Sequence, residues 1–159
     1  MRIQYLIPDG LGFEDIQATL RKNSRVHEES VRTLDRTYCD SFDWRLYRDD
    51  AVLEVTRDGK RRRLLWRSLQ GGRREVRLNL RQQPRFVRDL ANGPLRDRLE
   101  PVLGVRELVP VVRVRSRIHT LRILDKQDKT VASLAVEENT LPRQRGVRAG
   151  KLDKRAIIT

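Results

Sequence analysis

Alternating basic side chains in one stretch of the chain are the groups best suited to bind a ligand. Arg113, Arg115 and Arg117 are each separated by one residue, and His119 continues the alternation. Successive side chains of a β-strand point to opposite faces, so a strand here would place these groups on one face. Guanidinium groups bind phosphate oxygens in a bidentate manner and stay charged at physiological pH. We therefore predict a phosphate-binding face that comprises Arg77, Arg113, Arg115 and Arg117.

Acidic residues occupy similar polar positions in other alternating stretches. Glu75 shares its stretch with Arg77, Glu54 lies between two apolar residues, and Glu137 follows a valine. Clustered carboxylates are the ligands that Mg²⁺ and Mn²⁺ prefer, whereas single carboxylates among arginines act as counter-ions. The candidate metal ligands are therefore Glu54, Glu75 and Glu137, and the sequence leaves the counter-ion interpretation open for each of them.

Hydrophobic alternation and turn residues predict a fold made mainly of antiparallel strands. The predicted strands are residues 2–7, 30–40, 51–57, 62–69, 75–81, 108–117, 119–124 and 130–137. A helix is predicted from Phe13 onward, and 84–103 carries two short helical patterns. Asp58-Gly59 and Gly71-Gly72 are typical hairpin turns. We predict a mainly β (α+β) domain over 1–141, with short flanking helices, and a basic, loop-like extension or linker over 142–159.

The polar faces of these strands allow two interpretations. In the first, they form the solvated outer surface of an antiparallel sheet that covers an apolar core. In the second, the sheet closes into a barrel or tunnel whose interior is lined by arginines and a few acids. Arginines in a confined space repel one another unless acids or a bound polyanion compensate their charge, so the second arrangement would be an anion-binding site.

The composition of the chain limits its possible binding partners and its expected cellular location. The chain has 159 residues, with 35 Lys and Arg against 22 Asp and Glu, which gives a formal net charge of +13. Such an excess favours polyanionic partners: nucleic acid, acidic lipid surfaces or phosphate compounds. A single cysteine, Cys39, excludes a disulfide framework and a structural zinc cluster. The sequence has no membrane-spanning apolar run and no signal peptide at its start, so we expect a cytoplasmic location and no membrane partner.

Three segments resemble a known family. Residues 37–48 (TYCDSFDWRLYR) resemble the YxDTxDxxLxxxG segment of CYTH domains, in the subfamily that joins CYTH to a helical CHAD domain. Residues 86–99 and 104–115 resemble the same subfamily, and the likeness extends over about residues 1–140. The resemblance implies the triphosphate tunnel fold, an eight-stranded antiparallel β-tunnel in which basic residues hold a triphosphate and glutamates hold a divalent metal. That family includes triphosphatases acting on inorganic triphosphate, thiamine triphosphate or RNA 5′ ends, and class IV adenylyl cyclases.

The sequence also departs from this family. The acidic ExExK signature of the first strand is replaced by Arg2, Gln4 and Leu6, and Ala135 stands where the last strand usually has a second acid. Two-metal catalysis needs carboxylates that hold the ions. We therefore expect the binding of a Mg²⁺ or Mn²⁺ cofactor to be weakened or lost.

The sequence therefore favours a CYTH-like domain that binds a triphosphate or polyphosphate ligand with weakened or absent hydrolysis. One alternative is a divergent divalent-metal-dependent triphosphatase for inorganic triphosphate, thiamine triphosphate or a nucleotide. Another is a basic interaction or nucleic-acid-binding module, although the Arg61–Arg63 run at a hairpin tip is more typical of a solvated surface than of nucleic-acid contact. A CHAD-type helical partner and a dimer are further expectations.

Overall fold

A computed structural model describes residues 3–70, 75–146 and 148–159. Arg2 and the predicted Gly71-Gly72 turn lie outside the described residues. The described part contains nine strands, three α-helices and one 3₁₀ helix, and it divides into two compact units. No helix in this part is long and apolar enough to cross a membrane.

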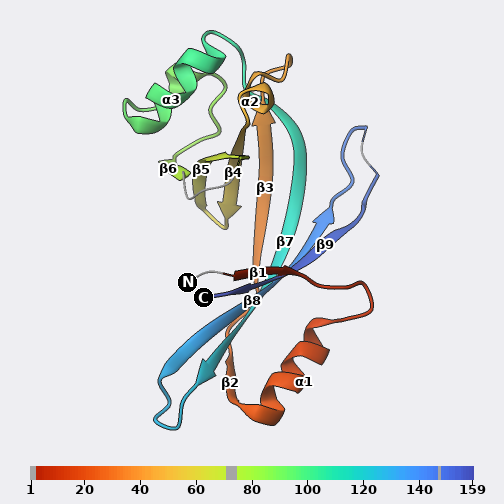
Figure 1. The fold of residues 1–159 in the computed structure, drawn as a ribbon. Coiled ribbons are helices and arrows are strands. Elements are labelled where there is room, and N and C mark those ends of the chain that lie inside the picture. Colours follow the sequence, from red (N-terminus) through yellow and green to blue (C-terminus); the bar gives the residue numbers. More distant parts are fainter. Residues whose placement is uncertain (1–2, 71–74, 147) are drawn as a thin grey trace. The chain divides into compact units, whose positions relative to one another are not determined.

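The first unit consists of Met1–Leu34 and Arg115–Thr159. Its elements, coloured red and blue in Figure 1, are β1 (Ile3–Leu6), α1 (Phe13–Asn23), β2 (Arg25–Glu28), β8 (Thr130–Leu141), β9 (Gly150–Ile158) and most of β7 (Val109–Leu124). The strands are antiparallel in the order β1-β9-β8-β7, and β2 also pairs with β7. Phe13 of α1 packs with Leu121, Leu134 and Val136, so α1 covers the apolar side of this sheet.

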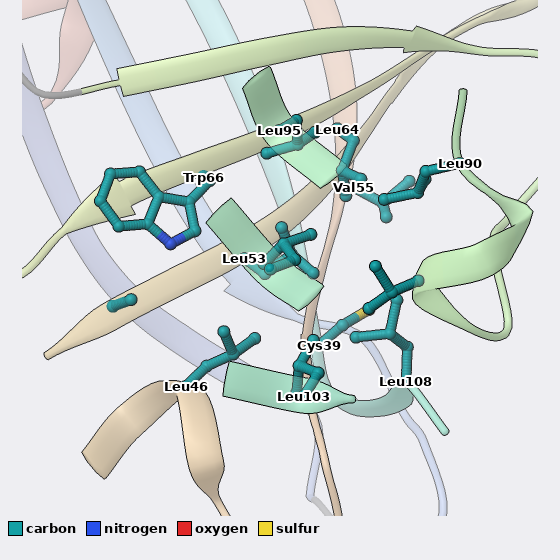
Figure 2. Packing of buried hydrophobic residues seen from close by; sticks show 13 residues of the cluster. Cys39, Leu46, Leu53, Val55, Leu64, Trp66, Leu90, Leu95, Leu103 and Leu108 are labelled. Atoms are coloured by element: carbon teal, nitrogen blue, oxygen red, sulfur yellow. The ribbon is translucent and has the colours of Figure 1, made fainter. Parts of the chain in front are cut away.

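The second unit consists of Asp35–Val114. Its elements are β3 (Arg32–Asp40), α2 (Arg45–Arg48), β4 (Ala51–Asp58), β5 (Arg61–Ser68), β6 (Glu75–Leu80), the 3₁₀ helix η1 (Val87–Asp89) and α3 (Pro94–Leu103). The strands are antiparallel in the order β3-β4-β5-β6. Gly59 makes the tight turn between β4 and β5 with a φ of 57°, which favours glycine. Cys39, Leu53, Leu64 and Trp66 point from one face of this sheet into a core that α2, η1 and α3 complete (Figure 2).

The predicted fold class, mainly antiparallel β with short flanking helices, is confirmed. The number of strands differs from the expected eight because 108–117 and 119–124 form one continuous strand, β7, and because β2 and β9 are additional. Ser116, which resembles a strand break in the sequence, is fully buried inside β7 and donates a hydrogen bond from its hydroxyl to Asn139 Oδ1 at 2.6 Å. A satisfied hydroxyl costs the strand little, so β7 continues through it.

The segment 142–159 is not loop-like throughout, because Gly150–Ile158 forms β9. This strand pairs with β8 on one side and with β1 on the other. Its high charge hides the alternation of Asp153, Arg155 and Ile157 with Lys154, Ala156 and Ile158. Pairing on both sides and polar partners on β8 allow this charged sequence to lie within the sheet.

Candidate anion-binding site

The face of β3–β6 opposite the hydrophobic core carries six charged side chains. Residues that pair across antiparallel strands point to the same side of the sheet, so the register defines this face. Its three cross-strand rows are Arg36–Thr56–Arg63–Asn79, Tyr38–Glu54–Leu65–Arg77 and Val52–Arg67–Glu75. We call it the arginine face. It gathers four guanidinium groups with two carboxylates.

Both carboxylates of the arginine face are engaged with neighbouring side chains. Glu54 is only 5% exposed; its Oε1 accepts a hydrogen bond from Thr56 Oγ1 at 2.9 Å and lies 3.7 Å from Arg36 Nε. Glu75 Oε2 accepts a hydrogen bond from Arg77 Nη2 at 2.7 Å. Glu54 and Glu75 thus lie beside arginines, in the geometry of counter-ions. With four arginines and two acids, the face keeps an excess of positive charge.

Tyr38 reports how closely the charges on this face interact. Burial, followed by the charge of Glu54, raises the pKa of the Tyr38 hydroxyl, while Arg36 and Arg67 act in the opposite direction. Arg67 is therefore within electrostatic reach of Tyr38. The Nε of Arg67 is buried and has no hydrogen-bond partner among the described residues. A buried donor without an acceptor is costly, and an anion at this face would satisfy it.

In the first unit, a buried polar network occupies one face of β7, β8 and β9. Asn139 accepts the hydrogen bond from Ser116, and its Nδ2 donates to Asp153 Oδ1 at 2.9 Å, while Arg155 Nε donates to Asp153 Oδ2. Burial alone would raise the pKa of Asp153, but the hydrogen bonds from Arg155 and Asn139 lower it below its ordinary value. Glu137 is buried on the same face and lies opposite Arg155 in the register.

The other residues of the predicted phosphate-binding face, Arg113, Arg115 and Arg117, belong to β7. Arg117 pairs with Glu138, not with Glu137, and His119 on the same face stacks on Phe13 with the ring centroids 4.1 Å apart. Arg115 and Arg117 are exposed on this face, opposite the Ser116–Asn139 network. In the second unit, burial raises the pKa of Cys39, and the charge of Arg113 acts in the opposite direction, so Arg113 lies within electrostatic reach of Cys39. In the second unit, Arg77 lies on the same sheet face as Glu54 and Glu75. In the first unit, Arg115 and Arg117 lie on the sheet face opposite Glu137.

The predicted metal ligands are divided between the two units: Glu54 and Glu75 belong to the second and Glu137 to the first. In the described part of the chain, no three His, Cys, Asp or Glu side chains gather in a way that could hold a metal ion. Gln4 and Leu6 of β1 lie opposite Ile157 and Arg155, so these two signature positions supply no carboxylate. Mg²⁺ and Mn²⁺ need several anionic oxygens. Within the second unit, both Glu54 and Glu75 are engaged with neighbouring side chains.

The segment 37–48 forms a rigid turn that begins α2. The buried Asp40 accepts backbone hydrogen bonds from Ser41 at 2.7 Å, Leu46 at 2.9 Å and Tyr47 at 3.0 Å. The hydroxyl of Ser41 accepts a further bond from the backbone of Arg45 at 3.1 Å. These contacts satisfy backbone donors that the start of a helix leaves unpaired. The motif therefore positions the end of β3 and the start of β4.

The lowered pKa of Asp43 in this turn should make the stability of the fold depend on pH in acid. Hydrogen bonds from Ser41 and Arg45, with the charge of Arg106, lower the pKa of Asp43 from 3.8 to about 2. A carboxyl with a lowered pKa in the folded state stabilises it above the unfolded pKa, and this contribution is lost as the pH falls through about 2. We expect Asp43→Asn to be less stable than the wild type at pH 5, with the difference shrinking toward pH 2. Urea unfolding at several pH values measures the difference in stability between the two proteins. A difference that does not depend on pH would contradict the prediction.

Cys39 is predicted to be unreactive in the folded protein. It is 5% exposed, and burial raises the pKa of its thiol to about 11. The thiolate is the reactive form, and at pH 8 a thiol of this pKa is ionised in about one molecule in a thousand. We expect modification by a disulfide reagent at pH 8 to be slow in buffer and fast in 8 M urea, on the order of a hundredfold or more. Equal rates would show that Cys39 is accessible.

Sequence analysis missed Arg36, Arg63 and Arg67. A signal for the last two is present, because they occupy positions alternate to Leu64 and Trp66 within one strand. Arg63 was instead assigned to the charged hairpin tip. Its pairing with Thr56 and Asn79 places it on the arginine face, which alternation within a single strand does not reveal.

The sequence matches no protein-family model and no curated protein sequence. Comparison with solved structures shows what the fold is similar to. A proposed adenylate cyclase from Bacillus halodurans matches 99% of this chain and 78% of its own chain, with a TM-score of 0.63 and 11% identity. A proposed adenylate cyclase from Vibrio parahaemolyticus matches 99% of this chain and 73% of its own, with a TM-score of 0.53 and 9% identity.

A third solved structure adds a described activity. It is a proposed adenylyl cyclase from Hippeastrum that is described as having a dominant triphosphatase activity. It matches 99% of this chain and 77% of its own, with a TM-score of 0.52 and 9% identity. At these identities the similarity establishes the fold of the chain.

Proposed function

Since the fold of the chain is that of a CYTH domain, we propose that it binds inorganic triphosphate or polyphosphate through its arginine face. The observation that carries this proposal is the buried Nε of Arg67, which has no hydrogen-bond partner among the described residues. It lies on a face where four guanidinium groups outnumber two carboxylates. A phosphate oxygen accepts hydrogen bonds and carries the negative charge that this face lacks.

The arrangement favours a linear phosphate ligand over a single small anion. Arg63 and Arg67 lie four residues apart on β5, and Arg77 lies on the neighbouring strand. Four residues of a β-strand span about 13 Å. Guanidinium groups spread over this length can contact successive phosphoryl groups of one chain. Arg63 and Arg77 are exposed, whereas the Nε of Arg67 is buried, so the contact with Arg67 gains most from a dielectric constant lower than that of bulk solvent.

We propose that hydrolysis is weakened or absent. Glu54 and Glu75 are engaged with Thr56, Arg36 and Arg77, and Glu137 lies opposite Arg155. A guanidinium beside a carboxylate repels a divalent cation and occupies one of the oxygens that the cation would need. The arginine face would therefore hold and orient phosphoryl groups without a metal that activates water. The competing function is a metal-dependent triphosphatase. In it, these glutamates would release their arginine partners and bind the metal ion instead.

A phosphate-release assay separates the two functions. The protein is incubated with tripolyphosphate in the presence and absence of Mn²⁺, and orthophosphate is measured. We expect no release above the protein-free rate in either condition. Release that depends on Mn²⁺ and is lost in Glu54→Gln would overturn the proposal of weakened hydrolysis and establish the triphosphatase. Mn²⁺-dependent release that is lost in Glu75→Gln or Glu137→Gln would also establish the triphosphatase, whereas release that is unchanged in all three variants indicates a contaminating enzyme.

A further inference from the structure

A second positively charged surface lies in the first unit, on the face of β7, β8 and β9 that is opposite the Ser116–Asn139 network. Two cross-strand rows define it: Arg115–Thr140–Lys151 and Arg117–Glu138–Lys154. We call these six residues the β7–β9 basic surface. It contains four cationic side chains and one carboxylate; among the cations, the half-buried Lys154 donates a hydrogen bond from Nζ to the backbone oxygen of Leu11 at 3.1 Å. Arg115, Arg117 and Lys151 are exposed.

The chain that links β8 to β9 adds charge beside this surface. Arg143, Arg145 and Arg148 are all exposed in this link, which leaves β8 after Leu141 and enters β9 at Gly150 (Figure 1). Leu141 and Gly150 pair with each other one position beyond Thr140 and Lys151. The three arginines therefore continue from the Arg115 end of the surface.

The rest of the same sheet face is apolar and covered. His119 stacks on Phe13, and Leu121 and Val136 pack with the same helix, α1. The face is thus divided into a half that α1 covers and a half that is charged and open to solvent. Since α1 already satisfies the apolar half, the exposed arginines and lysines are not needed to form the core.

We propose that the β7–β9 basic surface binds the phosphodiester backbone of double-stranded nucleic acid. This inference does not rest on the proposed function of the arginine face, because the two surfaces belong to different units of the chain. At an exposed position, one pair of opposite charges contributes little, because water screens their attraction. A small phosphate ion would therefore bind weakly here, whereas a duplex presents many phosphates at once and releases condensed counterions.

The dimensions of the surface agree with a polymeric ligand. Arg115 and Arg117 are two residues apart on one strand, which corresponds to about 6.6 Å, and β7 and β9 are separated by two strand spacings, or about 9.5 Å. Duplex DNA carries one negative charge per about 1.7 Å of its axis, so a short length of duplex can face all four cations. Contacts of this kind carry no sequence information, so we expect binding that is independent of base sequence. The middle positions of the two rows, Thr140 and Glu138, offer no apolar side chain for insertion into a lipid surface.

The test measures how the affinity for a labelled 20-base-pair DNA duplex depends on salt, by fluorescence anisotropy of the full chain. Four phosphate contacts predict a slope of log K against log salt of about −3.6, or steeper if the link arginines take part. Arg115→Ala/Lys151→Ala should reduce the magnitude of this slope by about 1.8. Arg115→Lys/Arg117→Lys retains the charge and should leave the slope unchanged. Thermal unfolding of each variant shows that it is folded.

Four results would overturn the inference. The first is no duplex binding by the wild type at 50 mM salt. The second is an equal slope for the wild type and Arg115→Ala/Lys151→Ala. The third is loss of duplex binding in Arg63→Ala, which would assign the duplex to the arginine face. Phosphatidylserine vesicles and inorganic polyphosphate serve as comparison ligands, and binding of either that depends on Arg115 and Lys151 without duplex binding would also reject the proposed ligand. The tripolyphosphate affinity of Arg115→Ala/Lys151→Ala should equal that of the wild type, which keeps this test separate from the proposed function.

Discussion

Arg67→Ala is expected to weaken tripolyphosphate binding by about 10- to 100-fold. The Nε of Arg67 is buried and has no hydrogen-bond partner among the described residues, so a bound phosphate oxygen would satisfy it. Hydrogen bonds to charged groups contribute about 1.5–3 kcal/mol, and about 1.4 kcal/mol corresponds to a factor of ten in affinity. Isothermal titration calorimetry of the wild type and the variant measures the difference.

Two further variants make this result specific. Arg62 lies on the same strand but pairs with Arg57 and Leu80, so it points to the opposite side of the sheet. Arg62→Ala removes the same charge and should change the affinity by less than about threefold, because exposed charges act weakly at a distance. Arg67→Lys retains the charge without the planar guanidinium and should fall between the wild type and Arg67→Ala. Equal losses in Arg62→Ala and Arg67→Ala would mean that net charge, and not the arginine face, determines binding.

Leu99→Ala is expected to lower the free energy of unfolding by about 2–5 kcal/mol. Leu99 lies in α3, is 0% exposed and belongs to the cluster that fills the apolar side of β3–β6. Its truncation removes buried methyl groups and leaves a cavity, because close-packed neighbours relax only in part. Urea unfolding followed by tryptophan fluorescence is suitable, since Trp66 lies in the same cluster (Figure 2).

The matched control for Leu99→Ala is Val105→Ala. Val105 follows α3 closely in the chain but is 84% exposed, so its truncation should change the free energy of unfolding by less than about 0.5 kcal/mol. The arginine face depends on the position of β3–β6, which the core supports from behind. If Leu99→Ala cost less than 1 kcal/mol, the cluster around α3 would not be the structural support that we assign to it.

The strands could largely be predicted because their alternation is strong. Glu75–Leu80 alternates at every position, and Asp58-Gly59 marks the turn between β4 and β5. β9 could not be predicted in this way, because Lys151, Asp153, Lys154 and Arg155 give it the composition of a solvated tail. Its place in the sheet comes from pairing with β1 and β8, which are distant in the sequence.

The site was harder to predict than the strands. Alternation correctly separates Arg115 and Arg117 from Ser116, but it does not show which side of β7 faces the buried charges of neighbouring strands. That information is in the register, which pairs Ser116 with Asn139 and places Glu137 opposite Ile118. Arg77 shares a short alternating strand with Glu75, so its face can be predicted from the sequence, whereas Arg36 joins the same face only through pairing with Thr56.

The most direct test of the central claim is a calorimetric titration of tripolyphosphate into the wild-type protein without added metal. A face with four arginines, two engaged carboxylates and a buried free donor at Arg67 predicts binding that needs no divalent ion and weakens as the salt concentration rises. Saturable binding in the presence of EDTA, reduced by Arg67→Ala and retained by Arg62→Ala, is the predicted result. Binding that appears only after Mn²⁺ is added would contradict it and would show that the carboxylates, not the arginines, hold the ligand.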